Sequence, residues 1–156
     1  MKTYWRVIKY SAGKDVSVDE PDEVLEIEGN ILTLGGITTL WNLVTQAGTA
    51  TPYNSSNAHI GVGNGTTPED RSQDRLQGTS VAYKPVDSGY PTVQGDTAIW
   101  QATFGVNEAA FAWNEAGVAN GNNPPTNGVL LNRKVATMGT KPADATWILQ
   151  VRITLT

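Results

Sequence analysis

The chain has 156 residues, no cysteine and a formal net charge of −4 at pH 7. At this length folding removes about two-thirds of the unfolded chain's surface from water, so we expect one domain with its own core and no cofactor. The lack of cysteine excludes disulfides, thiolate metal sites and a cysteine nucleophile. The acidic balance, with no Lys/Arg cluster larger than Arg133 and Lys134, argues against a nucleic-acid partner.

Residue usage favours strands joined by turns over helices. The chain has 16 Gly, 8 Pro, 5 Trp and 5 Tyr, and only 17% of its residues are charged. A surface of neutral polar side chains can be covered by neighbours at little desolvation cost. No window approaches the roughly 20 apolar residues of a membrane helix, and the first residues lack a signal-peptide core. We therefore expect no membrane partner, and synthesis in soluble form without Sec-type export.

The first predicted strand runs from Thr3 to Tyr10. Trp5 and Val7 face one way and Tyr4 and Ile8 face the other, so both faces carry apolar bulk. An acidic stretch follows from residue 15 to residue 28, with a short edge strand near its end. This stretch lacks the D-x-[DN]-x-[DN]-G pattern of a calcium loop, so a solvated loop is the favoured interpretation.

One helix is predicted over Ile37 to Ala47. Its apolar residues recur at helical spacing, Thr38 or Thr39 can cap its first turn, and Gly48 can end it. A loop with the sequence TATPYNSSNA comes next, and then a short strand, HIGVG.

Glycines between Gly61 and Gly65 superficially resemble a phosphate-binding loop. No lysine follows them, the G-x-G-x-x-G spacing fails, and Glu69 and Asp70 would place negative charge at the positive end of the next helix. The favoured interpretation is a tight turn that leads into a Thr-capped helical turn, TPEDRSQDRL.

The second half of the chain shows the clearest period-2 alternation. Thr97 to Phe104 and Ala109 to Trp113 are predicted to form a hairpin, followed by a loop, a strand over Val129 to Met138 and a final strand over Trp147 to Leu155. We expect Trp100, Trp113 and Trp147 to lie in the core. Strands at this spacing, with one short helix and no βαβ rhythm, predict a single all-β domain, a β-sandwich or jelly roll.

Candidate catalytic groups are few. His59 is the only histidine, and the sequence has no G-x-S-x-G motif, so neither a catalytic triad nor a multi-histidine metal site is expected. Glu108 and Glu115 are seven residues apart, which in a strand separates them by more than about 20 Å, too far for a glycosidase pair. One is expected in a turn and the other to cap a bend. We predict no enzyme activity and no catalytic, cofactor-binding or metal-binding residue.

Aromatic residues are the better candidates for function, because Tyr and Trp present an apolar body and a polar tip to a protein or sugar. Tyr53 and Tyr90 lie in turn-rich segments, and the first strand carries apolar bulk on both faces. The predicted interface residues are Tyr4, Trp5, Ile8, Tyr10, Tyr53 and Tyr90.

Three stretches of the sequence form an ordered set of motifs: IGVGNGTTPEDRSQDRLQG, WQATFGVNEAAFAWNEAGVANG and GVLLNRKVATMGTKPADATWILQVRITL. In this order they resemble a widespread group of small virion structural proteins of tailed bacteriophages. That group carries an IG-x-G-x-T-x-P segment, a TFG-x-x-EA-x-x-x-WNE-x-G row, an LNR element and a closing W-x-L-x-V-x-I strand. The resemblance covers Ile60 to Thr156 and departs at Ala116, where an aromatic residue often follows the glutamate.

The resemblance implies a jelly-roll-like domain in the virion and assigns no catalytic residue. The short chain lacks fibre-type repeats, which favours a homotrimeric capsid decoration (cement) protein on the capsid surface, made in the host cytoplasm, with the major capsid protein and itself as partners. A tail fibre or baseplate module that binds a receptor or glycan is the alternative, and a free lectin-like domain or an enzyme is a third. Residues 1–34 are predicted to be an attachment arm outside a core of residues 35–156.

Overall fold

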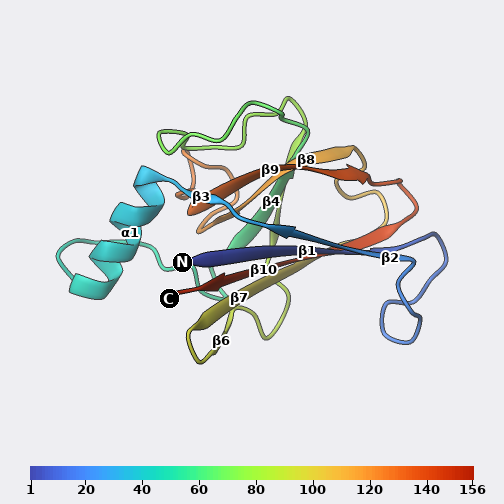
Figure 1. The fold of residues 1–156 in the computed structure, drawn as a ribbon, viewed down its shortest axis with the longest axis horizontal. Helices are drawn as coiled ribbons and strands as arrows, with labels where there is room; N and C mark the ends of the chain where they lie inside the picture. The colour runs from blue at the N-terminus through green and yellow to red at the C-terminus, as the bar shows by residue number, and fades with distance from the viewer.

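The computed structural model describes residues 1–156 and contains ten strands and one helix (Figure 1). The elements in chain order are β1 (Lys2–Tyr10), β2 (Glu23–Glu28), β3 (Ile31–Leu32), α1 (Leu34–Thr45), β4 (His59–Gly63), β5 (Val81–Pro85), β6 (Thr92–Gln94), β7 (Thr97–Phe104), β8 (Ala112–Ala119), β9 (Asn132–Thr140) and β10 (Thr146–Thr154). Sheet A has the order β2-β1-β10-β7-β6, and sheet B has the order β3-β9-β8-β4-β5. All pairings are antiparallel, so the predicted all-β sandwich with one short helix is confirmed.

The first strand lies inside sheet A. β1 pairs with β10 along its whole length, from Lys2 opposite Thr154 to Tyr10 opposite Thr146, and β2 pairs with its other edge. Residues 1–34, which the sequence suggested as an arm outside the core of residues 35–156, instead supply β1, β2 and β3 to the two sheets. The reason is the alternation itself, because it places Trp5 and a valine on the inner face of the sheet with no exposed surface.

An aromatic cluster fills the space between the two sheets. Trp113 packs edge-to-face against Phe104, with ring centroids 4.9 Å apart, and against Trp147 at 5.0 Å. Trp100 is also buried, so the three tryptophans predicted for the core are there. The predicted final strand is confirmed as β10, whose residues Trp147, Leu149, Val151 and Ile153 face the core.

The predicted hairpin between β7 and β8 is wrong. β7 pairs with β10 and β6 in sheet A, whereas β8 pairs with β4 and β9 in sheet B. Between them the chain crosses from one sheet to the other, and Asn107 and Ala109 adopt positive φ angles of 62° and 47° in this crossing. Alternation shows that each strand has a buried face, but it does not identify the neighbour.

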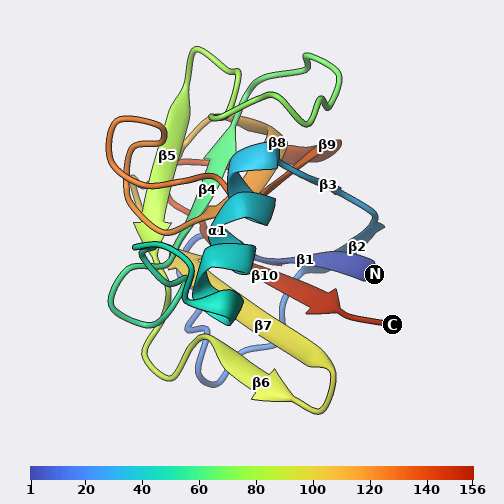
Figure 2. The same cartoon turned by 90° about the vertical axis from the view of Figure 1, so that its left-hand side faces the viewer.

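The helix begins three residues before its predicted start. Thr33 is the N-cap, and its hydroxyl accepts a hydrogen bond of 2.9 Å from the Gly36 amide. A Cβ at Gly36 would collide with the backbone of Leu131, so this glycine lets α1 approach sheet B closely. Gln46 ends the helix in the left-handed conformation. Figures 1 and 2 show α1 lying across one end of the sandwich, the end at which both termini emerge.

Candidate functional site

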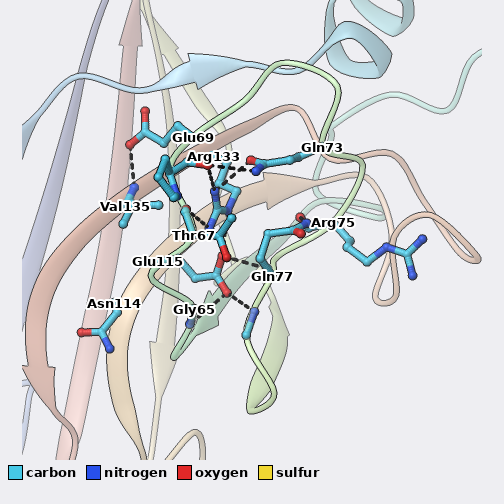
Figure 3. Close-up of polar contacts among 12 residues, drawn as sticks. Gly65, Thr67, Glu69, Gln73, Arg75, Gln77, Asn114, Glu115, Arg133 and Val135 are labelled. Carbon is cyan, nitrogen blue, oxygen red and sulfur yellow. Dashed lines mark hydrogen bonds and ion pairs between the residues drawn. The ribbon is translucent and has the colours of Figure 1, made fainter.

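A fully buried ion pair joins β8 to β9 (Figure 3). Glu115 and Arg133 have no exposed side-chain surface, and the Arg133 Nε atom lies 2.7 Å from the Glu115 Oε2 atom. A β-bulge shifts the register between Trp113 and Glu115. As a result Trp113 packs between the sheets, whereas Glu115 lies under the loop of residues 64–80 that joins β4 to β5.

Both members of this pair bind that loop. The Glu115 carboxylate accepts backbone hydrogen bonds from Gly78 at 2.7 Å, Gln77 at 2.9 Å and Gly65 at 3.2 Å. The remaining Arg133 donors bind the other side of the loop, where they reach the side-chain oxygen of Gln73 at 2.8 Å and the carbonyl oxygens of Thr67 at 3.0 Å and Pro68 at 3.4 Å.

These contacts leave no charged group of the pair available for chemistry. Each oxygen of Glu115 is already hydrogen-bonded, and neither side chain reaches solvent. A buried ion pair resists rearrangement, because separation of its two members would leave an uncompensated charge in the interior. The pair therefore fixes the path of the 64–80 loop.

Sequence reasoning missed this arrangement, although both residues stand in quoted motifs, Glu115 in WNE and Arg133 in LNR. One of Glu108 and Glu115 was expected to cap a bend. Glu115 does accept loop amides, but from a fully buried strand position. The usable signal was one carboxylate and one guanidinium, each inside an apolar strand, because such charges are buried only when paired.

The other candidate catalytic groups occupy separate sites. Glu108 lies in the crossing before β8, where it bonds Lys84 at 2.5 Å and the Gly105 amide at 2.7 Å. The hydrogen bond from Lys84 holds the pKa of Glu108 below its usual range. The His59 Nδ1 atom lies 2.8 Å from the Asn57 carbonyl oxygen. Glu108 and Glu115 thus each have their own cation and bind different loops.

The glycine-rich segment does not present free amides to an anion. A Cβ at Gly63 or Gly65 would collide with the Glu115 carboxylate, which occupies the space that a phosphate would need. The predicted helical turn that follows is also wrong, because residues 66–75 are irregular, with a turn only at residues 71–72 and a bend at residue 75. Asp70 accepts hydrogen bonds from both the amide and the hydroxyl of Ser72, a local arrangement that competes with a helix.

The acidic stretch between β1 and β2 is held by its own short contacts. Asp22 pairs with Lys14 at 2.6 Å, and this hydrogen bond lowers the pKa of Asp22 to about 2. No group of three or more His, Asp or Glu residues lies together in a metal-binding arrangement.

The predicted interface residues do not come together. Trp5, Tyr10 and Tyr53 are buried, and only Tyr4, with 40% of its surface exposed, is freely accessible. Ile8 is half-buried on β1, and Tyr90 is half-buried in the loop that joins β5 to β6. Tyr53 was expected to be an accessible loop residue. It is instead drawn into the core, where its carbonyl accepts a 3.0 Å hydrogen bond from the Trp100 indole and burial raises the pKa of its hydroxyl to about 12.

The open end of the sandwich, beside α1, carries a cavity of about 310 Å³. Its walls come from both sheets, from α1 and from the two termini, and they are almost entirely apolar. The principal lining residues are Leu32, Leu40, Val93, Trp100, Ile153 and Leu155.

Large apolar side chains on both walls of this cavity, and next to it on α1, are exposed to solvent. On α1, 63% of Trp41 and 75% of Val44 are exposed, and Leu40 links them to the cavity wall because residues three and four apart are neighbours on a helix. Val93 and Leu155 are exposed to 75% and 69% on the opposite wall. We call this surface the apolar end: Met1, Leu40, Trp41, Val44, Val93 and Leu155.

The helical part of the apolar end lies in an uncharged part of the sequence. No Asp, Glu, Lys or Arg occurs between Glu28 and Glu69, a segment that contains all of α1 and the loop after it. A solvent-facing helix normally carries charged residues on its outer face. The other four tryptophans are buried, so Trp41 is the one tryptophan in solvent.

Comparisons with known proteins give no further guide. No protein-family model matches the chain, and no curated protein matches it. The structure has no helix with the length and apolar character required to cross a lipid bilayer.

Proposed function

We propose that this chain is a non-enzymatic virion structural protein, a capsid decoration (cement) subunit that stabilises the head by binding neighbouring proteins. The observation that carries the proposal is the apolar end, where Leu155 lines an apolar cavity and Trp41 and Val44 are exposed on the helix that forms part of its wall. Contiguous exposed apolar surface on a soluble protein marks a site of association. The resemblance of Ile60 to Thr156 to small phage virion proteins supplies the setting.

The rest of the fold suits a rigid building block. The two sheets share one aromatic core, and a buried ion pair fixes the long 64–80 loop. A subunit that resists expansion of a shell must transmit force without local unfolding, and fully bonded loops serve that purpose better than mobile ones. The major capsid protein and further copies of this chain are the proposed partners.

A tail-associated module that binds a receptor or glycan is the second candidate. Tyr4 stands on the outer face of sheet A beside Arg6, Arg152 and Glu26, and together they line a small hollow of about 120 Å³. An exposed tyrosine among hydrogen-bonding side chains is a common sugar contact.

Copy number separates the two candidates. Quantitative mass spectrometry of purified particles should find hundreds of copies per virion if the chain decorates the capsid, and a few to tens if it belongs to the tail. Absence of the chain from purified particles would contradict both. A glycan array probed with the wild-type chain and with Tyr4→Ala tests the second candidate, which requires binding that the substitution removes.

A further inference from the structure

We infer that the apolar end is covered by a second copy of this chain, with Trp41 of one copy seated in the cavity of its neighbour. The inference rests on the proposed function, since it names one partner of the proposed assembly surface. It starts from the fact that the molecule carries a projecting apolar group and an apolar cavity side by side, joined through Leu40.

The cavity has the size for such a guest. Its volume of about 310 Å³ lies at the lower end of the range for pockets that hold small organic molecules, about 300 to 1,000 Å³. Because its walls are apolar, water inside finds few hydrogen-bond partners, and its displacement by an indole is favourable. Tryptophan is among the residues enriched at the centres of protein interfaces.

One occupant must account for both features. A small apolar ligand would fill the cavity but leave Trp41 and Val44 in water. A second copy covers both, because it presents the same projection and the same cavity. In a symmetric contact Trp41 of each copy fills the cavity of its neighbour, so that no other component is needed to complete the site.

Electrostatics also favours a second copy. Each chain carries a formal charge of −4, so association through a charged patch would place like charges near one another. The helix and loop that form much of this end have no charged side chain between Glu28 and Glu69. Asp96 is the one charged side chain among the residues that line the cavity. The helix and the loop can therefore face another copy of this chain without charge repulsion.

The test compares two valines that are equally exposed at opposite ends of the molecule. Figure 1 shows α1 and the loop between β1 and β2 at opposite ends of the molecule. Val44 on α1 is 75% exposed, and Val18 in that loop is 78% exposed. Sedimentation velocity of the full chain should show a discrete oligomer for the wild type and for Val18→Asp. Val44→Asp should weaken association by about 100-fold or more, because it buries an unpaired carboxylate in the contact. Circular dichroism melting at low concentration, where association is absent, should be unchanged in both variants, because both side chains then lie in solvent.

A wild-type chain that stays monomeric, or a Val44→Asp chain that retains the oligomer, overturns the inference. Incorporation into purified particles is measured in parallel to separate this failure from that of the proposed function. If the wild type is monomeric in solution but Val44→Asp abolishes incorporation, a different virion protein covers the apolar end and only the inference fails. If the wild type forms the Val44-dependent oligomer but is absent from particles, the inference stands and the proposed function fails.

Discussion

The outer face of sheet B buries charged side chains, whereas the apolar end exposes apolar side chains to solvent. Under the 64–80 loop, Glu115 and Arg133 are fully buried although both are charged. The same loop contributes Leu76 to a small apolar cluster with Ala119 and Leu130. At the apolar end, by contrast, a tryptophan and several aliphatic side chains stand in solvent.

On the outer face of sheet B the chain itself covers the buried groups, whereas at the apolar end it leaves apolar side chains for a partner to cover. The loop supplies a hydrogen-bond partner for each buried charge, so that side of the sandwich is finished in a single copy. No segment of the chain covers Trp41 or Val44. Substitutions in the first region should therefore change folding stability, and substitutions in the second should change association.

Arg133→Met should have one of the two largest effects on stability. It leaves the Glu115 carboxylate buried without its cation, at a cost of about 3 to 5 kcal/mol in the free energy of unfolding. Chemical denaturation measures this loss. Arg75→Met is the matched control, because Arg75 forms an exposed pair with Asp74 and should cost less than about 1 kcal/mol.

Trypsin gives a second measure of the same prediction, because Arg71 and Arg75 lie within the held loop. Arg133→Met should be cleaved at these sites faster than the wild type under native conditions, because the loop opens locally. Equal cleavage rates would show that the ion pair does not control the loop.

Tyr53→Ala should cost about 3 to 5 kcal/mol, since the buried ring lies in the main core and its loss leaves a cavity. Tyr4→Ala, at a site that is 40% exposed, should change stability by less than about 0.5 kcal/mol. Thermal and chemical unfolding compare the two. Equal effects would contradict the placement of Tyr53 in the core.

Alkaline pH should destabilise the fold through the same tyrosine. Burial raises the pKa of Tyr53 to about 12 from an ordinary value of 10.0, so between these values the unfolded chain loses this proton and the folded chain retains it. Stability is unaffected below pH 10 and falls as pH rises toward 12, by about 2 to 3 kcal/mol for this group. Tyr53→Phe should show a correspondingly smaller fall in denaturation series at pH 9 to 12.

Trp41→Ala should have the smallest effect on folding. The side chain is 63% exposed, so its removal should change the free energy of unfolding of the isolated chain by less than about 0.5 kcal/mol. Measurements at low concentration, where association is absent, test this. A loss of several kcal/mol would place Trp41 in the folding core and remove the contrast between the two regions.

The sequence was sufficient for the elements with strong periodicity. Alternation in the last eleven residues predicted β10, and the helical spacing around Leu40 and Trp41 predicted α1. Strand pairing was not accessible in the same way, because alternation shows a buried face without naming the neighbour. The crossing near Asn107, and the interior position of β1, depend on pairing over long sequence distances.

The candidate sites were harder still to predict. An irregularity in the β8–β9 pairing next to Glu115 decides which side of the sheet this residue faces, and such a register shift leaves no mark on composition. Tyr53 has a loop sequence, yet the Trp100 indole binds its carbonyl and holds it inside. Leu40, Trp41 and Val44 were all placed on the predicted helix, but the helical spacing alone could not show which of them the sandwich would leave uncovered.

The accessibility of Trp41 to acrylamide tests the central claim most directly, because the other four tryptophans are buried. The difference in quenching between wild type and Trp41→Phe isolates the signal of this one residue. We expect strong quenching of Trp41 at low concentration and in the Val44→Asp chain, and protection with a blue-shifted emission in the assembled wild type. Quenching that is equally strong in the assembled protein would contradict the claim that assembly covers the apolar end.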